Sequence, residues 1–160
     1  MFFCQPEHII HLQTLLQHYQ IDIRLVAERH KIPGSWFGEP EAGIIKNQLY
    51  IRSDTPVHSA LHESCHYICM DELRRQTLNT DAAGGYDEEN GVCYLQILLS
   101  EQLPFMNKRL MMQDMDEWGY TFRLGSAQRW FKEDAQDARQ WLLQYGLINS
   151  NDQPTWKLRK

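Results

Sequence analysis

A chain of 160 residues, with 42% hydrophobic and 23% charged residues, is expected to fold as one globular domain with a real core. The net charge of −5 argues against nucleic acid as a partner, because a phosphate-binding surface needs gathered Lys and Arg. No run of about 18 apolar residues is present, so the sequence predicts no membrane span. It also predicts no signal peptide, since no basic region precedes the short apolar segment Met1–Cys4.

The first part of the chain predicts one helix followed by short strands. Apolar residues recur at helical spacing from Pro6 to about Tyr19, which predicts a helix. Alternation of apolar and polar residues in Ile21–Val26 predicts a strand. Two further β-like runs, Gly43–Ile45 and Leu49–Arg52, flank the turn-like Lys46–Gln48 and predict a hairpin.

A loop rich in Pro and Gly lies between these strands, marked by Pro33–Ser35 and Gly38–Pro40. Two aromatic residues, Trp36 and Phe37, stand inside it. We expect them to anchor the loop to the core. The alternative is that they form a platform for a substrate.

The second half of the chain predicts three more helices. After a break at Thr80–Gly85, a largely buried helix is expected from about Asp87 to Gln102. Others are expected from Phe105 to about Trp118 and from a Ser126 cap to Tyr145. The basic tail with Lys157, Arg159 and Lys160 is expected to be solvated.

These elements predict a single α+β domain over residues 1–160, mostly helical, with a short β-sheet or hairpin and a helical C-terminal part from about residue 105. The four cysteines do not follow a secreted disulfide pattern, so we expect free thiols in a reducing cytoplasm. They are Cys4, Cys65, Cys69 and Cys93.

The motif that points to chemistry is HExxH, formed by His62-Glu63-Ser64-Cys65-His66. Residues four apart on a helix share one face, so His62 and His66 can bind the same metal ion. Glu63 follows the first histidine and would lie beside the metal, where a carboxylate can accept a proton from water. Asp54 or Thr55 is expected to cap the start of this helix.

A catalytic zinc site takes three protein ligands and leaves a position for water, so a third ligand is needed. No histidine lies beyond His66, and the candidates are Glu88 and Glu89 at the start of the next helix. Adjacent helical residues are about 100° apart, so only one of the two can easily face the metal. A zinc cage of Cys65, Cys69 and both histidines is disfavoured, because one straight helix cannot wrap around an ion.

In these residues the chain resembles the small gluzincin-type zincins, above all the ImmA/IrrE-type metallopeptidases. In that family a β segment leads into the HExxH helix, and the next helix begins with a Glu in an E-x-E-A-x-x-F-A-x-x-L-L-like pattern. Here Leu49–Arg52 precedes the motif and Glu88–Leu99 follows the second pattern. The resemblance covers about residues 20 to 104; otherwise the chain is similar to uncharacterised bacterial proteins.

The resemblance implies that His62, His66 and Glu88 hold Zn²⁺, with Glu89 as the alternate ligand, and that the protein hydrolyses peptide bonds with Glu63 as general base. Ser64-Cys65, Asn90 and the adjacent Glu89 depart from the family pattern. The substrate would be a peptide or protein, extended along the β segment Gly43–Arg52. Candidates to stabilise the oxyanion are Tyr120, Arg123 and His58, although His58 is expected to be a plain surface residue.

Two other functions fit the same sequence. The chain could be a zincin-fold protein that binds metal but acts as a protein-interaction module. It could also be a helical interaction domain in which HExxH is accidental, with two surface histidines on an ordinary amphipathic helix.

Overall fold

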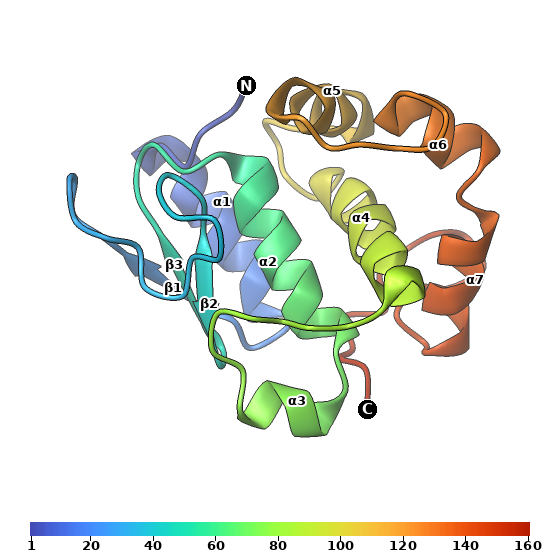
Figure 1. Cartoon of the computed structure of the whole chain (residues 1–160), viewed down its shortest axis with the longest axis horizontal. Helices are drawn as coiled ribbons and strands as arrows, with labels where there is room; N and C mark the ends of the chain where they lie inside the picture. The colour runs from blue at the N-terminus through green and yellow to red at the C-terminus, as the bar shows by residue number, and fades with distance from the viewer.

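The computed structural model describes all residues from 1 to 160 and has the predicted α+β architecture, with seven helices and a sheet of three strands (Figure 1). In chain order the elements are α1 (Pro6–Gln17), β1 (Asp22–Leu25), β2 (Gly43–Ile45), β3 (Gln48–Ile51), α2 (Val57–Cys69), α3 (Glu72–Gln76), α4 (Tyr86–Ser100), α5 (Lys108–Trp118), α6 (Ala127–Glu133) and α7 (Gln136–Gln144). None of these helices has the length and apolar character needed to cross a membrane.

The sheet lies directly before the motif helix, as the sequence predicts. Its order is β1-β3-β2, with β1 parallel and β2 antiparallel to the central β3. The predicted hairpin is confirmed, and its turn takes a left-handed residue at Lys46, with φ 51°. In β3, Leu49 and Ile51 are fully buried whereas Gln48 and Tyr50 are partly exposed, so one face of the strand joins the core.

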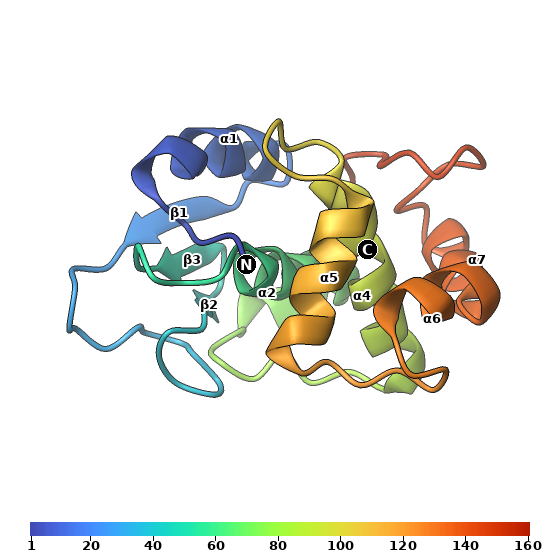
Figure 2. The same ribbon diagram turned by 90° about the horizontal axis from the view of Figure 1, so that it is seen from above.

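Helix α2 lies at the centre of the molecule, between the sheet and α4 (Figures 1 and 2). On its far side α4 packs against α7, where Gly91 lets the indole of Trp141 approach the helix backbone. A Cβ added at Gly91 would lie 2.7 Å from Cε3 of that indole. All four cysteines are buried and free, as expected.

The helices differ from those expected in two places. Helix α3 was not predicted; the Asp71 side chain caps it by accepting a hydrogen bond from the backbone N–H of Arg74 at 3.0 Å. The segment predicted as one last helix forms two helices, α6 and α7. At the break between them, Asp134 Oδ2 accepts a hydrogen bond from Arg123 Nε at 2.9 Å. Ser126 caps α6 as predicted.

Neither predicted cap begins α2, whose N-cap residue is Pro56 without a side-chain hydrogen bond. The Thr55 hydroxyl instead accepts from the backbone N–H of Arg52 at 2.9 Å, and the Asp54 carboxylate pairs with the Arg52 guanidinium. Both side chains therefore stabilise the turn before the helix rather than the helix itself.

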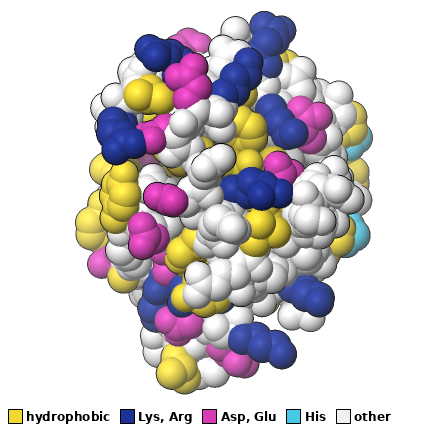
Figure 3. Space-filling view, turned by 90° about the vertical axis from the view of Figure 1, so that its right-hand side faces the viewer, with side chains coloured by type: hydrophobic (Ala, Val, Ile, Leu, Met, Phe, Trp, Pro, Cys, Tyr) yellow, Lys and Arg dark blue, Asp and Glu magenta, His cyan; other side chains and the backbone are white.

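The C-terminal tail is not uniformly solvated. Lys157 and Lys160 are exposed, but Arg159 donates to Glu88 at 3.0 Å and to the carbonyl oxygen of Cys69 at 3.2 Å. Its guanidinium also lies 4.0 Å from the ring centroid of Tyr145. On the face that carries α6 and α7, acidic and basic side chains are interspersed (Figure 3).

The outer edge of β2 is already occupied by the chain itself. The N–H of Ile44 donates to the Gly34 carbonyl at 3.3 Å, and the Ile44 carbonyl accepts from Thr80 at 3.0 Å. Since β3 is central and both outward groups of Ile44 are bonded, a peptide cannot add as a strand here. The structure therefore offers no free backbone group at Ile44 for the substrate pairing expected along Gly43–Arg52.

This closed edge depends on the absence of a side chain at Gly43. A Cβ there would lie 1.9 Å from the Pro33 carbonyl oxygen and 2.5 Å from the Gly34 carbonyl carbon. We predict that Gly43→Ala lowers the free energy of unfolding by about 2–3 kcal/mol, measured by urea denaturation. Gly85→Ala is the control, because nothing lies within 4 Å of its Cβ position. Equal stability of the two variants would contradict the packing described.

Candidate metal centre

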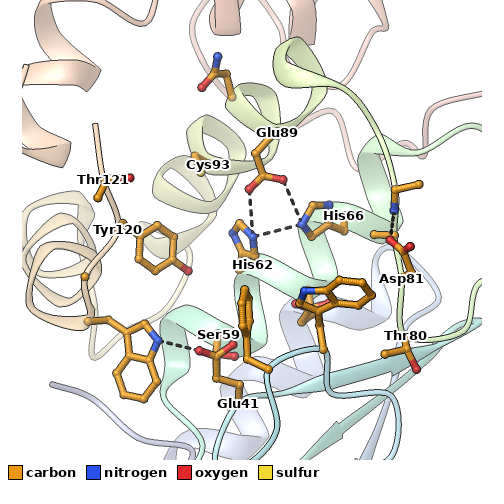
Figure 4. Close-up of a pocket in the computed structure, with 18 of the residues that line it drawn as sticks. Glu41, Ser59, His62, His66, Thr80, Asp81, Glu89, Cys93, Tyr120 and Thr121 are labelled. Atoms are coloured by element: carbon orange, nitrogen blue, oxygen red, sulfur yellow. Dashed lines mark hydrogen bonds and ion pairs between the residues drawn. The ribbon is translucent and has the colours of Figure 1, made fainter. Parts of the chain in front are cut away.

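Two helices bring three potential ligands together (Figure 4). His62 and His66 project from α2, with their Nε2 atoms 3.2 Å apart. Glu89 projects from the first turn of α4, with Oε1 3.3 Å from Nε2 of His62 and Oε2 3.3 Å from Nε2 of His66. The motif histidines therefore share one face, as their spacing predicts, and a carboxylate from the next helix joins them.

The separations of these atoms suit a tetrahedral metal ion. Zinc bonds to His nitrogen and carboxylate oxygen are about 2.0–2.2 Å long, so tetrahedral geometry separates ligand atoms by about 3.3 Å. The two nitrogens are 3.2 Å apart, and each lies 3.3 Å from a different oxygen of Glu89, so each nitrogen–nitrogen and nitrogen–oxygen contact has the length that shared zinc ligands would have. Two imidazoles and one carboxylate also form a donor set typical of catalytic zinc. The residues present therefore fit zinc.

The expected preference for Glu88 as third ligand is not supported by its position. Glu88 is buried and points away from the histidines, toward Arg74 and Arg159. Arg74 binds both of its oxygens, and Arg159 Nη1 lies 3.0 Å from Oε2. Glu89, the alternate candidate, is the carboxylate that lies beside His62 and His66.

The phase of α4 explains this choice. Residues at i, i+4 and i+7 share a helix face, and from Glu89 these are Cys93 and Gln96. From Glu88 they are Val92 and Leu95, both fully buried apolar residues. The polar stripe was visible in the sequence as a signal for Glu89, but the family pattern pointed to Glu88.

Gln96 is a site residue that the sequence analysis did not single out. It is fully buried, its Oε1 lies 3.0 Å from Nδ1 of His62, and its Nε2 donates to the His58 carbonyl at 3.0 Å. The carbonyl bond directs Oε1 toward the imidazole, so the His62 Nδ1 carries the proton and Nε2 is free to bind metal. A glutamine in a helix otherwise lined with buried apolar residues was the available signal.

The pKa values of the two histidines are shifted in opposite directions. Burial and the neighbouring His62 lower the pKa of His66 to about 4. Burial opposes a charge on His62, but Tyr120, Cys93 and Glu89 raise its pKa well above the ordinary value. Because histidine binds a metal in its neutral form, a cation bound here would displace a proton from His62.

Glu63 lines the same cavity as both histidines, with 8% of its surface exposed. Burial raises the pKa of its carboxyl to about 7, while the charge of His62 acts in the opposite direction. A carboxylate with a pKa near neutrality can both accept and return a proton.

The cavity has a volume of about 740 Å³ and contains only one of the three candidate oxyanion groups. The Tyr120 ring lies in its wall, 5.6 Å from the ring of His62, and its hydroxyl lies 3.2 Å from Nδ1 of His58. His58 is not a surface residue: it is 1% exposed, and burial lowers its pKa to about 3. Arg123 is exposed and pairs with Asp134 outside the cavity.

The loop aromatics do not anchor their loop to the core, contrary to expectation. Trp36 is 58% exposed and Phe37 is 78% exposed, and both line the cavity. Their position agrees with the alternative of a platform beside the candidate metal centre.

Comparison of the chain with protein family models, curated proteins and solved structures finds no match. The geometry of the site is therefore the basis on which its function must be inferred.

The two adjacent glutamates are expected to have separable roles. Glu88→Gln should leave zinc affinity within about threefold, but lower the free energy of unfolding by about 2 kcal/mol, because Arg74 and Arg159 lose their shared anion. Glu89→Gln should weaken zinc binding at least tenfold with little effect on the stability of the zinc-free protein. Zinc titration with a competing chelator and urea denaturation measure both quantities. The reverse pattern would restore Glu88 as the ligand.

Proposed function

We propose that this protein is a zinc-dependent metallopeptidase, with His62, His66 and Glu89 as metal ligands and Glu63 as general base. The observation that carries the proposal is that two histidines and one glutamate bring their ligand atoms within 4.8 Å of one another, with the buried carboxyl of Glu63 lining the same cavity. Zinc bound there would lower the pKa of its water toward about 7 and polarise the scissile carbonyl.

The residues of the chain have distinct roles in this proposal. Glu63 accepts the proton of the attacking water and delivers it to the leaving amine. The Tyr120 hydroxyl, oriented by His58, donates a hydrogen bond to the oxyanion. Gln96 orients His62 and so keeps its Nε2 directed at the metal.

We also propose that the fold is a small zincin-type domain. Support comes from the order of its parts: a small sheet, the HExxH helix that packs on β2 and β3, and the next long helix bearing a carboxylate at its start. The C-terminal helices α6 and α7 lie outside this unit, and α7 packs on the far side of α4.

The metal is tested directly by elemental analysis of purified protein. We predict one equivalent of zinc per chain, removed by a chelator and restored by zinc at micromolar concentration. His62→Ala and His66→Ala should each lose the metal, because two remaining ligands do not hold zinc tightly. His11→Ala, at an exposed position of α1, is the matched control. A wild-type protein that takes up no zinc would refute the proposed function.

The general base is tested by Glu63→Gln. Gln is nearly isosteric but cannot accept the proton, so cleavage of an unstructured protein such as casein should fall by about 10²- to 10⁴-fold. Zinc content should not change, because Glu63 is not a ligand in this proposal. Cleavage at the wild-type rate would show that Glu63 is not the base. If zinc-loaded wild type cleaves nothing, the protein-interaction role is favoured instead.

A further inference from the structure

The cavity beside the candidate metal centre has a strongly one-sided charge. Four carboxylates line it, those of Glu41, Glu63, Asp81 and Glu89, and no Lys or Arg does. In the proposed function, Glu89 is a ligand of the zinc ion and Glu63 is the general base beside it. The two positive charges of zinc would balance the negative charges of these two carboxylates. Glu41 and Asp81 are left as negative charges that this chemistry does not use.

Glu41 is held in a defined position at the cavity wall. Its Oε1 accepts a hydrogen bond from the Trp118 indole at 2.8 Å, and it lies beside Ser59 at the base of the cavity (Figure 4). Ser59 in turn accepts from the backbone N–H of Ala42 at 2.9 Å, which ties this segment to α2. No cationic side chain of the protein pairs with Glu41, in contrast to Glu88.

Asp81 lies on the other side of the histidine pair, next to His66 (Figure 4). Its Oδ1 accepts from the backbone N–H of Ala83 at 2.8 Å, and it too has no Lys or Arg partner. The cavity therefore has a negative charge on each side of the candidate metal.

Aromatic side chains also line the cavity. Trp36, Phe37 and Tyr86 are all more than half exposed, which is unusual for such large apolar groups. Exposed aromatic side chains around a polar cavity are typical of a ligand-binding surface. Aromatic faces bind both apolar side chains and the stems and charges of Lys and Arg.

The closed edge of β2 limits how a peptide could be held here. Strand addition to Ile44 is blocked by Gly34 and Thr80, so main-chain pairing at this strand cannot provide affinity. Side-chain contacts in the cavity must then select the substrate.

We propose that the cavity binds an extended peptide segment in which a Lys or Arg adjoins a bulky apolar residue. The basic side chain pairs with Glu41 or Asp81, and the apolar side chain packs on Trp36 and Phe37. This substrate class rests on the proposed peptidase function, because the same cavity would contain the reacting bond.

The test measures binding separately from cleavage. Zinc-loaded Glu63→Gln protein is titrated with blocked peptides Ala-Ala-X-Phe-X-Ala-Ala, in which X is Lys, Gln or Glu. We expect the Lys peptide to bind about tenfold more tightly than the Gln peptide, and the Glu peptide to bind most weakly. Equal binding of the three peptides, or no binding, would overturn the proposal.

Substitutions at the two carboxylates locate the preference. In the Glu63→Gln protein, a further Glu41→Gln or Asp81→Asn substitution should reduce the ratio of Lys-peptide to Gln-peptide affinity about threefold. Both substitutions together should abolish the preference for Lys. Glu133→Gln, an exposed glutamate on α6 outside the cavity, is the matched control and should not change the ratio. A preference for Lys that survives the double change would also overturn the proposal.

The contact of the apolar peptide side chain with the loop aromatics is tested separately. Phe37→Ala should weaken binding of the Lys and Gln peptides by a similar factor of about five to ten. Leu73→Ala removes an equally exposed apolar side chain outside the cavity and should have no effect. Equal affinity of Phe37→Ala and the parent protein would exclude the platform.

Cleavage by wild type then separates the two proposals. Selective binding of the Lys peptide without cleavage of any peptide would support the recognition inference and refute the peptidase function. Cleavage of all three peptides at one rate would support the peptidase function and refute this inference.

Discussion

The packing of α4 along α2 is the constraint on which the rest of the site depends. Both helices are buried at their contact, and their relative rotation determines which side chain of α4 faces the histidines. A change of one residue in that phase is a rotation of about 100°, which would exchange Glu89 for Glu88. The two adjacent carboxylates thus have different partners: Glu89 lies beside the two histidines, and Glu88 forms ion pairs with Arg74 and Arg159.

Glu88 supports this phase from the opposite side of the helix. Its bonds to Arg74 and Arg159 connect the start of α4 to α3 and to the C-terminal tail. Gly84, with φ 96°, lets the chain turn close to that carboxylate, since a Cβ there would lie 2.7 Å from Oε1. A buried ion cluster of this kind holds geometry more than it adds net stability, because desolvation offsets much of the attraction.

The residues on one side of the histidine pair are buried, and those on the cavity side are exposed. Behind the rings, Gln96 and His58 are buried and hydrogen-bonded, which orients His62. In front, Trp36 and Phe37 remain exposed at the cavity. A rigid rear and an accessible front are what a site needs in order to position a metal and still admit a large ligand.

Local features of this protein follow from patterns of neighbouring residues in the sequence. Periodicity predicted α1, α4 and α5, and alternation predicted β1. Two β-like runs around a turn predicted the β2–β3 hairpin, and the i, i+4 spacing predicted that His62 and His66 share a face. These are properties of neighbours along the chain. The tertiary structure decided what depends on distant residues: the rotation of α4 that selects Glu89, the exposure of the Trp36–Phe37 loop, and the capture of Arg159 by Glu88. No local pattern encodes these contacts, because each joins segments that meet only when the core is packed.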